Sequence, residues 1–166
     1  MQFELKPISK DALPEALQKA ERYRLLNEPW QAESICLDVL RIDPENQRAL
    51  VTVLLSLTDQ FGNGAGAAQA REILSRLRGA YERAYYAGII WERLALAQLE
   101  RGAPGSVFDA FEMLREAMQR YEEAEAIRPA GNDDAILRWN TCARMLMRDQ
   151  NLRPRPEGAF EPILGE

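Results

Sequence analysis

Residues 36–50 read CLDVLRIDPENQRAL, and this stretch decides the fold. Apolar residues recur at helical spacing as far as Ile42, stop at Asp43–Pro44–Glu45–Asn46, and then resume at once. Proline ends a helix because it lacks an N–H group and disfavours helical geometry in the residue before it. Asp43 or Asn46 can cap the helix that follows. Because the break is so short, we expect the two flanking helices to be antiparallel neighbours.

The rest of the chain shows the same helical periodicity and no alternating pattern long enough for a strand, which predicts an all-α fold. Asn27 and Pro29 are expected to end one helix and begin the next, since Asn tolerates the left-handed conformation and Pro suits a first turn. Ser106 and Asp133–Asp134 are expected to cap the helices that they precede. The predicted helices are 13–26, 29–42, 47–61, 67–78, 81–101, 106 to 127 or 128, and 133–148.

A single helix pair is too thin to bury its own apolar face, so pairs of this kind stack along the chain. Residues 13–46 match one such unit, with Ala20 at the small position of the first helix and Tyr23 at its aromatic position. Ala32 falls at the key alanine of the second helix, and Pro44 at the closing proline. In these residues and in its period of about 34 residues the chain resembles the tetratricopeptide repeat (TPR) family.

The resemblance implies a short right-handed α-solenoid of antiparallel helix pairs with elongated C-terminal helices. Residues 1–150 would form one TPR-like domain. In the second unit Gly66 replaces the key alanine and Arg78 the closing proline, so the match is weaker there. Residues 151–166, which contain prolines and glycines, are expected to form an irregular tail. The units implied are 13–46, 47–80 and 81–131, followed by a capping helix at 133–148.

Composition narrows the class of function. The chain has 166 residues, of which 46% are hydrophobic and 28% charged, the range of a soluble globular domain. Its net charge of -5 argues against a nucleic-acid or membrane partner, since both usually require a basic surface. We see no signal peptide and no membrane span, and we expect Cys36 and Cys142 to be buried free thiols. These features predict a cytoplasmic protein, in a bacterial-type cytoplasm.

The sequence predicts no catalytic residues, no cofactor and no metal site. It contains no histidine, which removes His-based general bases, Ser-His-Asp triads and most transition-metal sites. The glycine-rich residues 62–66 lack the preceding strand and the following Gly-Lys-Ser/Thr of nucleotide loops, so they are interpreted as a connector. A small helical enzyme stays a minor alternative, with a site around Asp109, Glu112, Glu116 and Glu122.

The TPR resemblance implies a concave groove lined by the first helix of each pair. We therefore predict a non-catalytic protein–protein interaction module, a scaffold or adaptor that binds a peptide or helix of a protein partner in an apolar groove. An alternative is that neighbouring helices simply cover these residues. The groove residues implied are Leu17, Glu21 and Arg24 from the first unit, Arg48, Val51, Leu55 and Asp59 from the second, and Tyr85, Ile89, Glu92 and Arg93 from the third.

Two further possibilities stay open. The same groove would suit a cytoplasmic chaperone for a secreted or membrane-bound client, and the aromatic-rich residues 80–148 could fill either a core or the seam of a homodimer. The tail carries three large apolar residues, Phe160, Ile163 and Leu164, so we expect it to fold back on its own domain, with a disordered end as the alternative.

Overall fold

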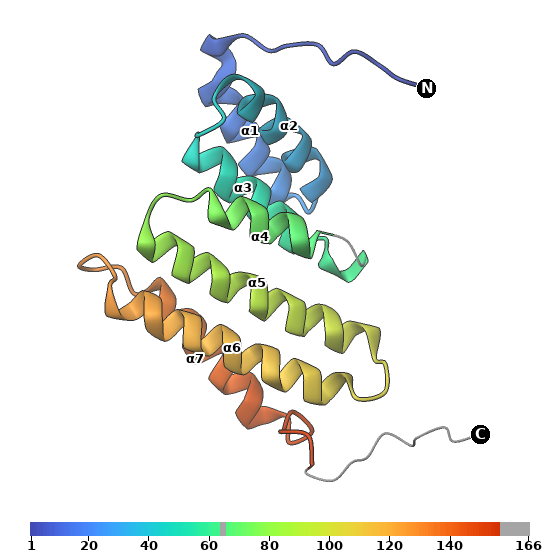
Figure 1. Ribbon diagram of the computed structural model, residues 1–166, viewed down its shortest axis with the longest axis vertical. Coiled ribbons are helices and arrows are strands. Elements are labelled where there is room, and N and C mark those ends of the chain that lie inside the picture. The colour runs from blue at the N-terminus through green and yellow to red at the C-terminus, as the bar shows by residue number, and fades with distance from the viewer. Residues whose placement is uncertain (64–65, 157–166) are drawn as a thin grey trace.

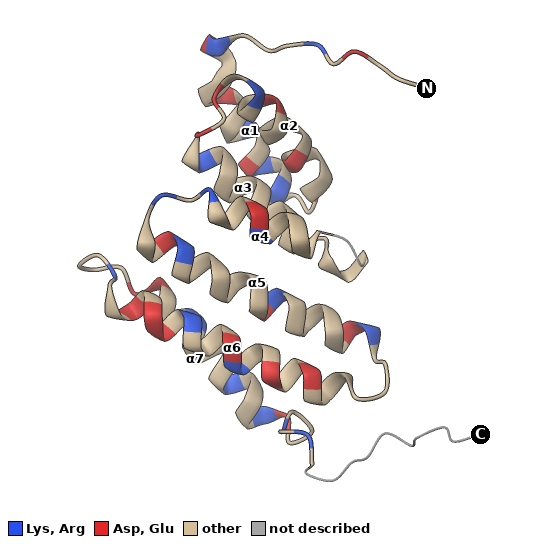
Figure 2. Cartoon of the chain, viewed as in Figure 1, with Lys and Arg blue, Asp and Glu red and all other residues tan. Residues whose placement is uncertain are grey.

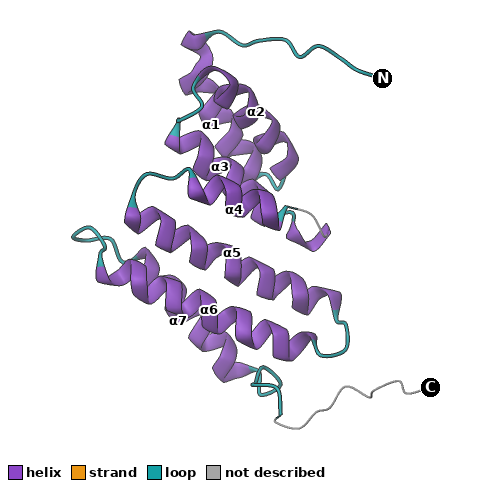
Figure 3. Ribbon diagram, viewed as in Figure 1, coloured by secondary structure: helices purple, strands orange, loops and turns teal. Residues whose placement is uncertain are grey.

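The computed structural model describes residues 1–63 and 66–156, and over these ranges the chain is all-α (Figures 1 and 3). Two short 3₁₀ helices, Lys10–Ala12 and Phe61–Asn63, accompany seven α-helices in the described residues, and no strand occurs there. The α-helices are α1 (Leu13–Leu25), α2 (Pro29–Ile42), α3 (Gln47–Thr58), α4 (Ala67–Ser75), α5 (Ala80–Arg101), α6 (Ser106–Ala126) and α7 (Asp134–Arg148).

The helices pack in chain order, from α1 near one end of an elongated molecule to α7 near the other (Figure 1). Each contacts the next, and α5 and α6, the two longest, lie side by side along their lengths. In addition α1 contacts α3, and α3 contacts α5. Helices α1, α3 and α5, which alternate along the chain, therefore also contact one another, and the candidate site lies between two of them.

Two helices end three residues earlier than the sequence predicts, and in both cases the reason is a buried side chain beyond the helix. α3 stops at Thr58 instead of residue 61, and a 3₁₀ turn then places Phe61 in the core. α4 stops at Ser75 instead of residue 78, and Leu77 turns inward. Burying a large apolar side chain stabilises the fold by more than the helical hydrogen bonds given up at a frayed end.

The capping predictions are partly correct. Asn46 caps α3, since its Oδ1 accepts a hydrogen bond from the backbone N–H of Ala49 at 3.0 Å, and Asn27 has the expected left-handed conformation with a φ of 62°. The prediction for Ser106 is wrong: Gly105, with a φ of 81°, precedes α6, and Ser106 is buried inside its first turn. A glycine accepts this φ without strain, and it has no side chain with which to cap the helix.

The cap predicted from the aspartates before α7 is also wrong. Asp133 occupies the capping position, but its side chain accepts no capping hydrogen bond. The Oδ1 atom of Asn132 accepts one instead, from the backbone N–H of Asp134 at 3.0 Å. An Asn side chain bonded to a backbone N–H two residues further on closes a local turn, and this turn leads the chain into α7.

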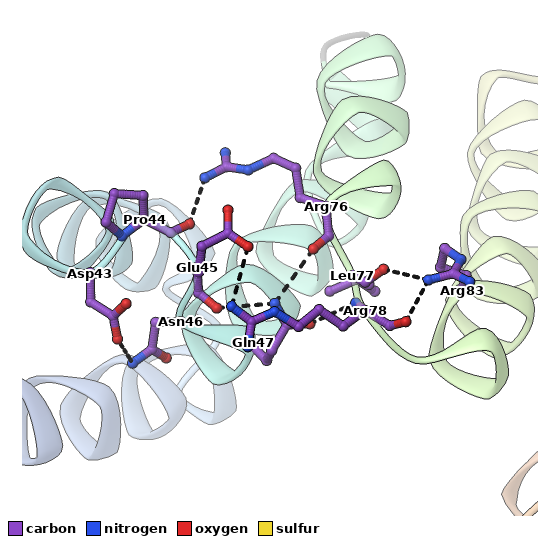
Figure 4. A network of polar contacts seen from close by, with 9 residues as sticks. All are labelled: Asp43, Pro44, Glu45, Asn46, Gln47, Arg76, Leu77, Arg78 and Arg83. Carbon is purple, nitrogen blue, oxygen red and sulfur yellow. Dashed lines mark hydrogen bonds and ion pairs between the residues drawn. The ribbon is translucent and has the colours of Figure 1, made fainter.

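A network of hydrogen bonds holds the turn after α4, where the sequence has no closing proline (Figure 4). The Gln47 side chain bridges this turn, accepting from the backbone N–H of Arg78 at 2.9 Å and donating to the carbonyl of Arg76 at 3.4 Å. Arg76 donates to the Pro44 carbonyl at 2.8 Å, and Arg83 donates to the carbonyls of Leu77 and Arg78. These bonds give partners to backbone carbonyls of the two turns, which lie outside the helices.

The core consists of two apolar clusters that touch. The first lies among α1 to α4 and also takes in Ile90 and Ala97 of α5, while the second lies among α5, α6 and α7. Leu55 and Tyr86 pack against both clusters and join them. Residues 151–156, the described part of the tail, have no helix, yet Leu152 is buried in the second cluster. The predicted docking of residues 158–164 falls outside the described residues.

We predict that Ala32→Leu destabilises the fold. Ala32 has no exposed surface in α2, so added methylene groups must strain the neighbouring helices, at about 1–3 kcal/mol. Thermal melting of the purified chain measures the effect. Ser34→Leu is the matched control, because it adds the same side chain at an exposed position of the same helix. Equal melting midpoints for Ala32→Leu and the control would contradict the packing described here.

Gly88→Ala should also destabilise the chain, although alanine normally favours a helix by about 1 kcal/mol over glycine. The Tyr121 ring of α6 lies directly on Gly88 of α5, and a Cβ atom built there would overlap the ring. We therefore expect a lower midpoint in urea unfolding. If the Gly88→Ala variant instead unfolds at a higher urea concentration than the unmodified chain, the two helices do not meet at this glycine.

Candidate interaction groove

A hollow of about 310 Å³ lies between α1 and α3 and is the candidate site. Its floor is mostly apolar, and charged side chains stand at its edges. Five of the predicted groove residues come together here. The lining residues are Glu21, Arg24 and Leu25 of α1 with Arg48, Val51, Thr52 and Leu55 of α3.

Helical spacing places these side chains on facing sides of the two helices. Val51, Thr52 and Leu55 come three, four and seven residues after Arg48, which puts the four side chains on one side of α3. Because the turn at 43–46 brings α3 back beside α1, this side of α3 faces the last turns of α1.

The charges at the edge of the hollow are paired across the two helices. The Arg48 guanidinium donates two hydrogen bonds to the Glu21 carboxylate, Nε to Oε1 at 2.6 Å and Nη2 to Oε2 at 2.8 Å. Bidentate contacts of this kind add geometric specificity to an ion pair. The hydrogen bond from Arg48 lowers the pKa of Glu21, which keeps the carboxylate charged.

A second ionic contact continues along the same side of the molecule. Asp59, which follows α3, accepts from Arg24 of α1 at 2.7 Å and lies 3.9 Å from Arg93 of α5. One carboxylate thus serves two guanidinium groups from different helices, and one positive charge is left over. The Nε atom of Arg93 is buried with no hydrogen-bond partner among the described residues. Elsewhere acidic and basic residues are interspersed along the helices (Figure 2).

Six predicted groove residues lie outside the hollow: Asp59 and Arg93 beside it, and four others in or near the core. Leu17 belongs to the first apolar cluster and Ile89 to the second, and both are buried. Glu92 is only 3% exposed, and Tyr85 is half-buried against the second cluster. The long contact between α5 and α6 turns Tyr85, Ile89 and Glu92 inward. A 34-residue repeat projected from the first unit places these three residues of α5 on the surface.

Glu92 is part of a buried polar cluster that the sequence does not reveal. Its carboxylate accepts hydrogen bonds from the Tyr121 hydroxyl of α6 and, at 3.0 Å, from Nη1 of Arg138 in α7. A buried carboxylate is tolerated only when it is paired and hydrogen-bonded in this way. Burial and the nearby Glu92 charge raise the pKa of Tyr121. The cluster thus joins three helices.

Sequence reasoning also missed an exposed apolar surface at the turn between α1 and α2. Leu25 is 84% exposed, Leu26 62% and Trp30 59%, and Leu25 also lines the hollow. Large apolar side chains gathered on a surface mark interaction sites more often than single ones do. The sequence signal for this exposed surface was the pair Leu25–Leu26, which comes directly before the break at Asn27 and does not fall on the apolar face of the helix.

The residues of the alternative enzyme site all lie on α6. Asp109 pairs with Arg155 at 3.0 Å, and Glu122 accepts a hydrogen bond from the Trp139 indole at 2.8 Å. Across residues 1–63 and 66–156 there is no group of three or more His, Cys, Asp and Glu side chains arranged to hold a metal ion. We identify no cofactor-binding residue in the part of the chain that the structure describes.

Comparison of the chain with protein-family models, with curated proteins and with solved structures finds no match. None of the helices in the described ranges combines the length and the apolar character needed to cross a membrane.

We predict that neither cysteine of the folded chain reacts with iodoacetamide at pH 8. Cys36 and Cys142 are buried and free, and burial raises the pKa of each thiol to about 12. The reactive species is the thiolate, which is almost absent at pH 8. Mass spectrometry after labelling should show both thiols modified in urea and neither without it. Labelling of the folded chain would contradict the burial described here.

The raised pKa of these two thiols makes the stability of the fold depend on pH. The folded-state pKa of each thiol lies above its ordinary value of 9.0, so the stability that it contributes is complete below pH 9. That contribution is lost as the pH rises from 9 to 12, because the unfolded thiols ionise first. We expect the urea midpoint to fall over this window, and Cys142→Ala to reduce the fall.

Proposed function

We propose that this chain is a non-catalytic interaction module that binds a peptide or helix of a protein partner in the hollow between α1 and α3. The observation that carries the proposal is the combination of an apolar floor with edge charges that already have partners. Val51 and Leu55 form part of the floor, Leu25 is largely exposed beside them, and Glu21 and Arg48 neutralise each other.

This arrangement favours an apolar ligand for an energetic reason. Fully burying a leucine or valine side chain contributes about 1.5–3 kcal/mol. A docking segment would cover Leu25 and the floor without stripping water from an unpaired charge, which is the step that usually opposes binding. The adjoining Leu26 and Trp30 extend the apolar surface beyond the hollow.

We also propose the TPR-like solenoid as the architecture that presents the hollow. Ala20 and Ala32, at the two small positions of the repeat, have no exposed surface. The contacts of α1 with α3, and of α3 with α5, are those expected when the first helices of successive pairs stack. The hydrogen bond from Arg76 to the Pro44 carbonyl links two turns 32 residues apart, close to the repeat length. The two buried free cysteines support a reducing, cytoplasmic compartment for such a module.

A peptide-display selection tests the proposed function. Peptides selected on the unmodified chain should bind Leu25→Asp at least about tenfold more weakly, because each 1.4 kcal/mol lost weakens binding tenfold. Leu25 is exposed, so the substitution should leave the melting midpoint unchanged. Leu37→Asp is the control, since Leu37 is an exposed leucine of α2 that does not line the hollow. Selected peptides that bind Leu25→Asp as tightly as the control would contradict the proposal.

A further inference from the structure

The last helix, α7, leaves large apolar side chains on its outer surface. Leu137 is 62% exposed and Met147 74%, whereas Ala135 and Cys142, on the opposite side, are buried in the second cluster. Helices inside the stack cover such a side with the next helix, but residues 149–156, the described residues after α7, contain no helix. The outer side, called the α7 flank below, consists of residues that helical spacing brings together, namely Ile136, Leu137, Asn140, Ala143 and Met147.

The described chain beyond α7 is held at the end of that helix. Since α7 returns along α6 after a short connection, the first turn of α6 lies at the same end of the pair as the C-terminal end of α7. Leu152 is buried in the second cluster, and Nη2 of Arg155 donates to Oδ1 of Asp109, in the first turn of α6, at 3.0 Å. The same guanidinium lies 5.4 Å from the centre of the Phe108 ring. These contacts keep residues 152–156 beside the C-terminal end of α7.

We propose that residues 157–166, called the end segment below, lie along the α7 flank of the same chain and cover Leu137 and Met147. The end segment follows the described residues, and its large apolar side chains are Phe160, Ile163 and Leu164. Its ten residues reach at most about 33–36 Å, whereas the axis of α7 from Arg148 back to Leu137 is about 16 Å long. The inference concerns a surface other than the hollow between α1 and α3, and it does not rest on the proposed function.

The end segment and α7 carry opposite charges. All the charged side chains of the end segment are acidic, and they are Glu157, Glu161 and Glu166. Arg144 and Arg148 are exposed on α7 next to the flank, and neither forms an ion pair with another residue of the ranges 1–63 and 66–156. Attraction between these charges favours α7 as the docking surface.

Two other surfaces fit the end segment less well. The exposed side of α6 carries Glu112, Glu116 and Glu122 around a hollow with a single arginine, Arg115, and its net negative charge repels an acidic segment. The exposed apolar surface at the turn between α1 and α2 lies near the opposite end of the molecule from α7 (Figure 1).

A tethered segment also suits the small area of the α7 flank better than a second copy does. The flank lies on a helix of 15 residues, which is about 22 Å long and about 10 Å wide. Stable interfaces between separate chains usually bury about 1,200–2,000 Å² in total, more than one such flank provides. A segment attached to the same chain is present at an effective concentration in the millimolar range, so a small contact suffices to hold it.

Thermal melting of the full chain tests the contact from the side of α7. Leu137→Asp should lower the melting midpoint by about 2–4 °C, because the end segment loses an apolar partner. Leu37→Asp is the matched control, with the same change at an exposed leucine of α2, and should leave the midpoint unchanged. Leu37 is 42% exposed, so without a docked segment the substitution at the more exposed Leu137 would have the smaller effect.

The same melt with a substitution in the end segment shows whether the two sides meet. Phe160→Asp should lower the midpoint by a similar amount, and Leu137→Asp should lower it no further in the Phe160→Asp chain, because both substitutions remove one contact. Effects that simply add, or a Leu137→Asp midpoint equal to that of the control, would overturn the proposal.

A disulfide experiment then locates the end segment. One chain carrying Met147→Cys and Phe160→Cys should close a disulfide within itself under mild oxidation and stay monomeric, since the native cysteines are buried. It should close at least about tenfold faster than a chain carrying Leu25→Cys and Phe160→Cys. Equal rates would mean that the end segment is undocked, and faster closure at Leu25 that it occupies the hollow between α1 and α3. Covalent dimers in place of the internal disulfide would mean that it docks on a second copy, and each of these three results contradicts the proposal.

Discussion

The reversal of the chain at residues 43–46 is the constraint on which the rest of the structure depends. Pro44 prevents α2 from continuing, and Asn46 caps α3 only a few residues later, so α3 must return beside α2. That return brings α3 into contact with α1 and creates the hollow between them. The Pro44 carbonyl of this turn and Gln47, the first residue of α3, hold the turn after α4. A single short break therefore positions four helices.

The two halves of the molecule are held together in different ways. Among α1 to α4 the helices meet through small and aliphatic side chains such as Ala20 and Ala32, and of the described residues there no charged side chain is buried as Glu92 is. Between α5 and α6 the close approach at Gly88 admits the Tyr121 ring, and the Tyr121 hydroxyl reaches Glu92. Arg138 then ties α7 to the same carboxylate. A buried paired charge of this kind fixes the relative positions of helices more narrowly than apolar contacts do.

The surface charges explain why the hollow suits an apolar ligand. Each charged group at its edge is already bonded to another group of the same chain, from Glu21 with Arg48 to Arg24 with Asp59. Such pairs contribute little to stability when they are exposed to solvent, but they remove the cost of leaving a charge unpaired when a ligand covers them. What remains for a ligand is the apolar surface of the floor and of Leu25.

The sequence by itself determined the all-α class, the order of the helices and the exact span of α2, because helical periodicity, proline and Asn-based turns are local signals. The positions projected from the repeat resemblance included Glu21, Arg24, Arg48, Val51 and Leu55, and the structure places these five around one hollow. Only the tertiary structure decided that Ile89 and Glu92 are buried and that Leu25 is exposed. The physical reason is that the long contact with α6, closest at Gly88, decides which side of α5 is buried. This contact joins residues far apart in sequence, so no local sequence pattern reveals it.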